Sequence, residues 1–175
     1  MPYTRTWSEE LVAEWLQLEG YFVEVSVPIG VTKKGGRFEA DVLGIKIKEH
    51  ILHVMHIEIG NLGQSAEKNI QTLQNKFSSQ KQNAIIDYCK KKLGFKGRVS
   101  YNNLYVATYV SKKTLPIAKK SNINLKRIED FIREDVVPAI NKWKANPPFH
   151  PKTRGKIIML PDGLWLLHLI DMMTR

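Results

Sequence analysis

Two short apolar segments, each interrupted by an acidic residue, constrain the fold of this chain most strongly. Residues 37–47 read RFEADVLGIKI, residues 51–60 read ILHVMHIEIG, and only the polar stretch KEH separates them. Apolar runs rich in β-branched residues around a short polar turn predict a β-hairpin. Asp41 lies inside the first strand and Glu58 near the end of the second. The fold must therefore place two carboxylates within or beside its sheet.

The hairpin brings these two acids to the same end of the strand pair. Counting inward from the turn, we expect a bulge of one or two residues to set Asp41 alongside Glu58. Two carboxylates that close repel each other unless a cation or a proton lies between them, and Mg²⁺ prefers carboxylate and water oxygens. The alternative is that each acid faces solvent or pairs with a lysine. His56 shares the strand face of Glu58, where it either packs through hydrogen bonds or contacts a metal or phosphate.

A helix is predicted before these strands, over WSEELVAEWLQLEG at residues 7–20. Ser8 is the expected N-cap, and Gly20 the expected stop. At helical spacing Glu9 projects along the border of the apolar stripe, whereas Glu14 falls on the wet face. One acidic side chain of this helix is thereby directed toward the edge of the core.

The remaining segments alternate between strand and helix patterns. Strands are predicted over 21–30, 102–111 and 155–161, and helices over 65–94 in two pieces, 123–146 with a kink at Pro138, and 162–173. This order predicts an α/β protein with a mixed sheet, built on a β-meander core and flanked by helices. The proline-rich NPPFHP loop divides a core domain, 1–146, from a strand–helix extension, 147–175, which packs on the core or on a partner in a homodimer.

The charge of the chain favours a polyanionic partner. Lys and Arg number 27 against 17 Asp and Glu, for a formal net charge of +10. Nucleic acid is the first candidate, and a merely soluble basic surface is the alternative. The expected contacts to the phosphate backbone come from the KKGGR loop before the Asp41 strand and from the SKK stretch. These residues are Lys33, Lys34, Arg37, Lys112 and Lys113.

Other features argue against a secreted or membrane-spanning chain. Cys89 is the single cysteine, so no disulfide can form within the chain, and its helical surroundings predict a buried structural thiol. The N-terminus has no apolar run of the signal-peptide type, and the longest apolar run, LWLLHLI, is too short to span a bilayer. We expect a cytoplasmic protein with no membrane partner.

The acidic residues together resemble the PD-(D/E)xK nuclease superfamily, the restriction-endonuclease-like fold that includes archaeal Holliday-junction resolvases. The helix glutamate of that pattern matches Glu9 in SEELVAEWLQLEGY, the strand aspartate matches Asp41 in FEADVLGI, and the acid of the next strand matches Glu58 in HIEIG. The resemblance covers residues 8 to about 75. It implies a restriction-endonuclease-like mixed sheet and an endonuclease that hydrolyses DNA with Mg²⁺ or Mn²⁺.

The resemblance also implies a role for each of these residues. Asp41, Glu58 and the main-chain carbonyl of Ile59 would hold the metal ion, and Glu9 would hold a second ion or its water shell. The family lysine should stand two positions after Glu58, where this chain has Gly60. Either Lys68 of the following helix supplies the ammonium, or activity is lost and the fold is an inactive nucleic-acid-binding module. A third reading is a basic interaction protein whose strand acids only form salt bridges.

Overall fold

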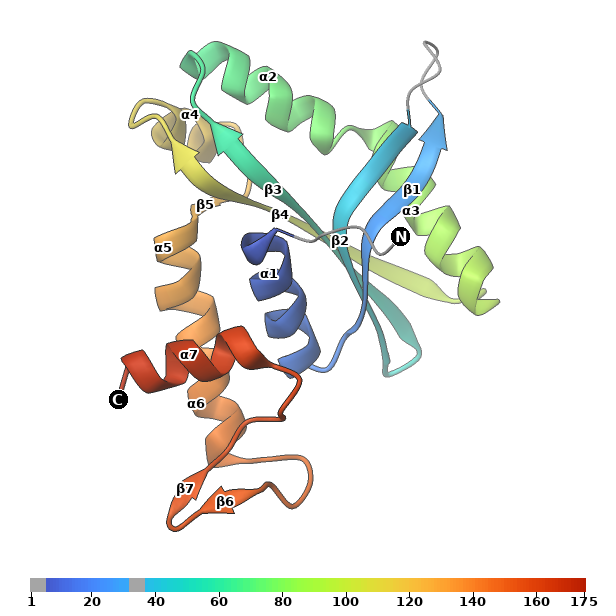
Figure 1. Cartoon of the computed structure of the whole chain (residues 1–175). Helices are drawn as coiled ribbons and strands as arrows, with labels where there is room; N and C mark the ends of the chain where they lie inside the picture. The colour runs from blue at the N-terminus through green and yellow to red at the C-terminus, as the bar shows by residue number, and fades with distance from the viewer. Residues whose placement is uncertain (1–5, 32–36) are drawn as a thin grey trace.

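The structure, a computed structural model that describes residues 6–31 and 37–175, contains a five-stranded mixed sheet with helices on both faces (Figure 1). The strands lie in chain order: β1 (Phe22–Val31), β2 (Arg37–Lys48), β3 (Ile51–Leu62), β4 (Arg98–Val110) and β5 (Leu125–Arg127). β1, β2 and β3 form an antiparallel meander, whereas β4 runs parallel to β3 and β5 parallel to β4. The predicted α/β class and β-meander are confirmed.

Two groups of helices cover the sheet (Figure 1). The elements are α1 (Trp7–Leu18), α2 (Ala66–Lys76), α3 (Ser79–Leu93), α4 (Thr114–Lys120), α5 (Ile128–Phe131), the π-helix η1 (Ile132–Val136), α6 (Val137–Ala145) and α7 (Trp165–Met173). The largest apolar cluster joins α1, α5, α6 and α7 to one face through residues such as Leu16, Ile57 and Phe131. Two smaller clusters join α2, α3 and α4 to the other face. Burial on both faces explains why the central strands carry nearly continuous apolar runs.

The β2–β3 hairpin has a regular register. Lys48 pairs with Ile51 across the turn, and the ladder continues without a shift to Val42 opposite Ile57. Glu49 and His50 form the two-residue turn with φ of 52° and 61°, the left-handed geometry that matches the twist of paired strands. The expected bulge between Asp41 and Glu58 is therefore wrong, because each acid lies seven residues from the pair that flanks the turn.

Helix α1 differs from its prediction at two positions. Thr6, rather than Ser8, is the N-cap. The helix ends before Gly20 as expected, and Gly20 has a φ of 81°. Glu14 is buried, with 1% of its surface exposed, and is not on a wet face. Its carboxylate accepts the main-chain N–H groups of Leu166 and Leu167 at 3.2 and 3.0 Å. The sequence pattern of α1 alone cannot show that α7 covers this face.

The C-terminal half contains two further differences. Residues 125–127 form the edge strand β5 rather than the start of a helix, because β4 offers an open edge for parallel pairing. Pro138 is preceded by the π-helix, in which Val137 N–H donates to the carbonyl of Ile132. A proline lacks an N–H and clashes with the preceding turn of a regular helix, and the wider π turn accommodates it.

The chain ends in a small hairpin and in α7, which packs beside α1 and α6 (Figure 1). The strand expected over 155–161 is reduced to β7 (Ile157–Ile158), which pairs with β6 (Thr153–Arg154) apart from the main sheet. In α7, Leu167 is buried in the main core, whereas Trp165 and Met173 are exposed. Within residues 6–31 and 37–175, no helix has the length and apolar character needed to cross a membrane.

We predict that Glu14 fastens α7 to the core. Glu14→Ala leaves the N–H groups of Leu166 and Leu167 without their acceptor, one partly and one fully buried, and should lower the free energy of unfolding by about 2–3 kcal/mol. Urea denaturation measures that loss, and hydrogen exchange at Leu166 and Leu167 should become faster. The exposed neighbour Gln17, replaced by Ala, serves as the control and should change stability by less than about 0.5 kcal/mol. Equal stability of the two variants would contradict the assignment.

Candidate metal-binding site at the strand fork

The site lies where β2 separates from β3, a point we call the fork. The β2–β3 ladder ends at Val42 opposite Ile57; beyond it β2 pairs only with β1, and β3 only with β4. Asp41 and Glu58 are the next residues after this last pair, one on each strand. The carboxylate of Asp41 accepts the main-chain N–H of Ile59 at 2.8 Å. The fork thus holds two acidic side chains at the positions that a continued ladder would place opposite each other.

Glu58 is fully buried and has a partner for each of its carboxylate oxygens. His56 Nε2 lies 2.8 Å from Oε1, and Lys76 Nζ, from the last turn of α2, contacts Oε2. Burial favours the neutral form of Glu58, but the hydrogen bond from His56 and the charge of Lys76 outweigh it, so the pKa of Glu58 is lowered. Glu58 is therefore a carboxylate at neutral pH in spite of its burial.

Asp41 experiences the opposite balance. Burial and the nearby charge of Glu58 together raise the pKa of Asp41 to about 6, although the Ile59 N–H and Lys76 oppose the shift. Protonated Asp41 would also share a hydrogen bond with Glu58. The two carboxylates therefore repel each other in spite of the ammonium of Lys76. A bound cation would relieve that repulsion.

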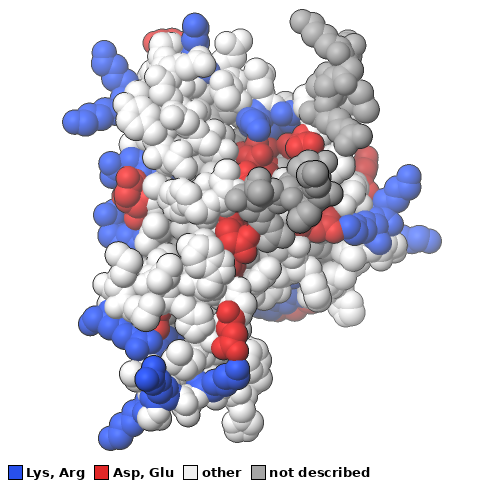
Figure 2. All heavy atoms as spheres, viewed as in Figure 1, with Lys and Arg blue, Asp and Glu red and all other residues white. Residues whose placement is uncertain are grey.

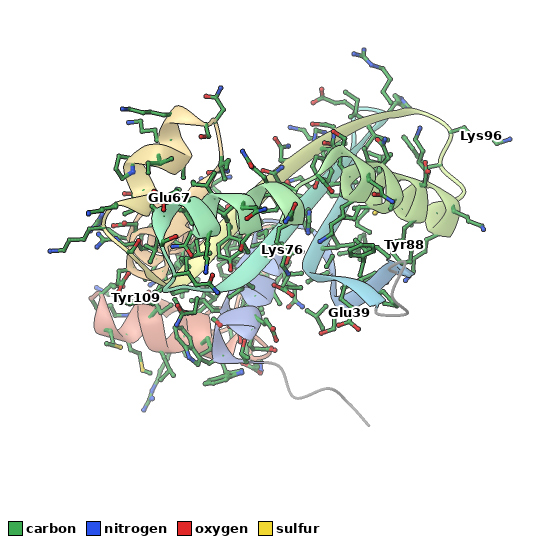
Figure 3. The ribbon with its side chains drawn as sticks, turned by 90° about the horizontal axis from the view of Figure 1, so that it is seen from above. Glu39, Glu67, Lys76, Tyr88, Lys96 and Tyr109 are labelled. Carbon is green, nitrogen blue, oxygen red and sulfur yellow. The ribbon has the colours of Figure 1, made fainter. Side chains whose placement is uncertain are left out.

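Lysines of α2 and α3 surround the acidic pair. Burial opposes the charged form of Lys76, but attraction to Glu58 and their hydrogen bond prevail and raise its pKa. Lys81 of α3 also interacts electrostatically with Glu58 and Asp41, and its ammonium lies 4.8 Å from the ring centroid of Phe38. Figure 3 shows Lys76 at one end of α2 and Glu67 at the other. The positive charge at this site thus comes from the end of α2 and from the start of α3.

Gly60 explains why no lysine follows Glu58 on its own strand. A Cβ at Gly60 would lie 2.7 Å from the hydroxyl of Tyr105, which pairs with Glu58 across the β3–β4 ladder. Tyr105 is 4% exposed, and burial, reinforced by Asp41 and Glu58, raises its pKa to about 12. The neutral phenol therefore fills the space that a side chain at position 60 would need.

Two of the predicted site residues lie elsewhere. The carboxylate of Glu9 accepts the N–H of Thr6 at 2.9 Å, completing a capping box at the start of α1, which packs on the opposite face of the sheet from α2. Lys68 is exposed in the first turn of α2, whereas Lys76 contacts Glu58 two turns later. The expected convergence of Glu9 with Asp41 and Glu58 is not found: across residues 6–31 and 37–175, no three His, Cys, Asp or Glu side chains are grouped to hold a metal.

The predicted DNA-contacting residues are only partly described. Lys33 and Lys34 lie outside the described residues, and Arg37 is the first residue of β2. Lys112 and Lys113 are exposed in the turn between β4 and α4. On the face seen in Figure 2, acidic side chains lie near the centre with a basic group beside them, and other basic side chains project at the edges.

Lys76 is the site residue that sequence reasoning missed, although the sequence does contain a signal for it. The buried positions of α2 are Ala66, Asn69, Ile70 and Leu73. Continuing that spacing by three residues leads to Lys76, whereas Lys68 lies off the stripe. A lysine on the buried stripe of a helix needs an acidic partner, and Glu58 supplies it.

Comparisons with known proteins show little similarity. No family model and no curated protein matches the chain. One solved structure, described as the crystal structure of a protein of unknown function, AF1548, aligns with a TM-score of 0.41 and 14% sequence identity. The alignment covers 88% of this chain and 71% of that chain. A similarity of this size carries no functional argument, so function must be inferred from the fork itself.

We predict that Tyr105 makes position 60 intolerant of any side chain. Gly60→Ala should lower the free energy of unfolding by about 1–3 kcal/mol, because its Cβ overlaps the Tyr105 hydroxyl. Tyr105→Phe removes that oxygen and should recover most of the loss in the double variant. Chemical denaturation of wild type, the two single variants and the double variant measures the coupling energy between the two substitutions. Additive effects of the two substitutions would contradict the proposed overlap.

We predict that Asp41 makes stability fall as pH rises. Its folded pKa of about 6 exceeds the ordinary value of 3.8, so the folded state binds the proton more tightly between these values. The stability that this tighter proton binding contributes is present below the lower pKa and is lost as pH rises through the folded pKa. The free energy of unfolding of Asp41→Asn, taken relative to that of wild type, should therefore rise by on the order of 2 kcal/mol from pH 4 to pH 7.5.

Urea denaturation at both pH values tests this prediction. Asp87→Asn, at an exposed position of α3, is the matched control and should follow the wild-type pH dependence. The assignment fails if Asp41→Asn differs from wild type by the same amount at pH 4 and pH 7.5.

Proposed function

We propose that the chain is a divalent-cation-dependent endonuclease acting on DNA, with an active site of the PD-(D/E)xK type at the fork. The main support is the arrangement of Asp41 and Glu58 beside the ammonium of Lys76. The two acids come from neighbouring strands, as in the resemblance, while the lysine comes from α2. In this proposal Lys76 replaces both the absent lysine at Gly60 and the earlier candidate Lys68.

The donor chemistry of the fork suits Mg²⁺ or Mn²⁺. Mg²⁺ is commonly bound through one or two carboxylates and several waters rather than by a full cage of protein ligands. Two carboxylates that repel each other meet that requirement, whereas a structural zinc site would need four ligands. Asp41 and Glu58 would hold the ion, with the main-chain carbonyl of Ile59 as a further ligand. Glu9 has no part in this site, because its carboxylate caps α1.

The chemistry follows from the groups at the fork. A bound divalent cation lowers the pKa of a coordinated water and withdraws charge from the scissile phosphate. Lys76 keeps its proton at neutral pH and would place a positive charge beside the phosphoryl oxygens, where negative charge develops. Tyr105 remains neutral beside the two acids, because burial and their charges raise its pKa. No nucleophilic side chain is required.

The basic character of the chain supports DNA as the substrate. A net charge of +10 favours binding to a phosphate backbone with little dependence on sequence. Lys112 and Lys113 are the exposed candidates within the described residues, and Lys33, Lys34 and Arg37 remain candidates in and beside the loop before β2. Such contacts would position the duplex, whereas the fork would carry the chemistry.

One observation favours a second candidate function, an inactive DNA-binding module on the same fold. Both carboxylate oxygens of Glu58 already have partners, in His56 and Lys76. If Lys76 held Glu58 permanently, a cation would be excluded and the pair would only stabilise the fold. Binding of DNA without cleavage distinguishes this candidate from the nuclease.

We predict that nicking of supercoiled plasmid in MgCl₂ or MnCl₂ depends on the fork. Asp41→Asn and Glu58→Gln should each slow cleavage by about 10²-fold or more, because they remove ligands of the ion. Lys76→Met should cost about 10²-fold through loss of the charge beside the phosphate. Lys68→Met alters the same helix at an exposed position and should leave the rate unchanged.

Three results would count against the nuclease. Cleavage that survives Asp41→Asn would show that another site, or a contaminating enzyme, is responsible. Cleavage that requires Lys68 rather than Lys76 would reverse the assignment of the lysine. Retention of DNA in a gel-shift assay, with no cleavage of linear, supercoiled or branched DNA in either metal, would favour the inactive binding module.

A further inference from the structure

His56 is a buried polar residue with a partner on each side of its ring. The side chain is fully buried, Nδ1 lies 2.8 Å from the hydroxyl of Tyr101, and Nε2 lies 2.8 Å from Oε1 of Glu58. The proposed chemistry at the fork uses neither His56 nor Tyr101. A buried chain of two hydrogen bonds that ends on an acidic side chain nonetheless fixes the direction of that side chain.

The direction of the hydrogen bonds follows from the two groups at the ends of the chain, Glu58 and Tyr101. Glu58 is a carboxylate and can only accept, so Nε2 of His56 carries a hydrogen and donates it to Oε1. Burial raises the pKa of the Tyr101 phenol, so Tyr101 keeps its O–H. With the hydrogen of the ring on Nε2, Nδ1 accepts that O–H at 2.8 Å.

The segment that carries Lys76 also packs against His56. Phe77, the next residue, meets the imidazole edge to face with ring centroids 5.3 Å apart. His56 therefore has a fixed ring plane as well as a fixed tautomer. One short segment, Lys76–Phe77, contacts Glu58 through its first residue and the group that orients Glu58 through its second.

We propose that Tyr101 and His56 form a positioning relay that holds Glu58 in its ion-binding orientation. The relay anchors Oε1 and leaves Oε2 directed at Lys76 and the Asp41 side of the fork. His56 thus acts through Glu58 and is a positioning residue, not a ligand of the ion. This inference rests on the proposed cation site. Hydrogen bonds that orient metal-binding side chains typically contribute 10–100-fold to metal affinity.

Titration with MnCl₂, followed by calorimetry and by the electron paramagnetic resonance of free Mn²⁺, tests the relay without a catalytic assay. Tyr101→Phe keeps the ring but removes the O–H, and His56→Leu removes the donor to Glu58. Each should raise the Kd for Mn²⁺ by about 10–100-fold. His56→Gln retains an N–H donor and should recover part of the affinity. His53→Leu, on the same strand but outside the relay, should bind as wild type does.

A second measurement reads the relay directly in the folded protein. Long-range ¹⁵N–¹H correlation spectra of the histidines should show the Nε2–H tautomer of His56 in wild type. In Tyr101→Phe, a near-isosteric variant that we expect to fold, the Nε2–H tautomer should persist, because Glu58 still accepts from Nε2, but the ¹⁵N resonance of Nδ1 should shift, because Nδ1 loses the O–H that it accepts. An unchanged Nδ1 resonance together with wild-type Mn²⁺ affinity in Tyr101→Phe would overturn the relay.

Different results would contradict the relay alone and the cation site on which it rests. If Asp41→Asn abolishes Mn²⁺ binding while Tyr101→Phe and His56→Leu leave the Kd unchanged, the relay is wrong and the cation site stands. If Asp41→Asn leaves Mn²⁺ binding unchanged, or if wild type binds no Mn²⁺, the proposed function fails and the relay fails with it.

Discussion

The repulsion between Asp41 and Glu58 at the fork is the constraint on which the rest of the site depends. Strand pairing ends just before these residues, which the register of the hairpin places opposite each other. The Ile59 N–H stabilises one carboxylate, while His56 and Lys76 stabilise the other. The fold compensates fully for Glu58 and only partly for Asp41, whose pKa is raised to about 6. An incompletely compensated buried charge is costly for stability and is a common feature of functional sites.

This constraint connects parts of the structure that are far apart in the chain. Gly60 admits the Tyr105 hydroxyl, and the phenol removes the position from which a strand lysine would act. The last turn of α2 supplies the ammonium instead, and Phe77 packs on the histidine that contacts Glu58. A parallel β3–β4 connection requires a long crossover, here the pair α2 and α3, which crosses the same face of the sheet as the fork. The topology therefore determines which helix can reach the acids.

Much of this arrangement could be predicted from the sequence, because it depends on local periodicity. The hairpin, its turn and the nearness of Asp41 to Glu58 follow from two apolar runs of known spacing around KEH. The tertiary partners could not be predicted in this way. Glu9 and Glu14 both lie in α1, and only the docking of α7 decides that Glu14 is buried while Glu9 caps its own helix. Lys76 rather than Lys68 meets Glu58 because of the path of α2 over the sheet, although the buried stripe of α2 already leads to position 76.

A crystal of the protein grown or soaked with MnCl₂ offers the most direct test of the central claim, that the two acids at the fork together hold a divalent cation. Anomalous scattering from manganese locates the ion independently of any interpretation of the surrounding density. The account predicts a single strong anomalous peak within bonding distance of the carboxylates of Asp41 and Glu58, with Lys76 nearby. A peak bound only elsewhere on the surface, or carboxylates of Asp41 and Glu58 that point away from each other in the measured structure, would contradict it.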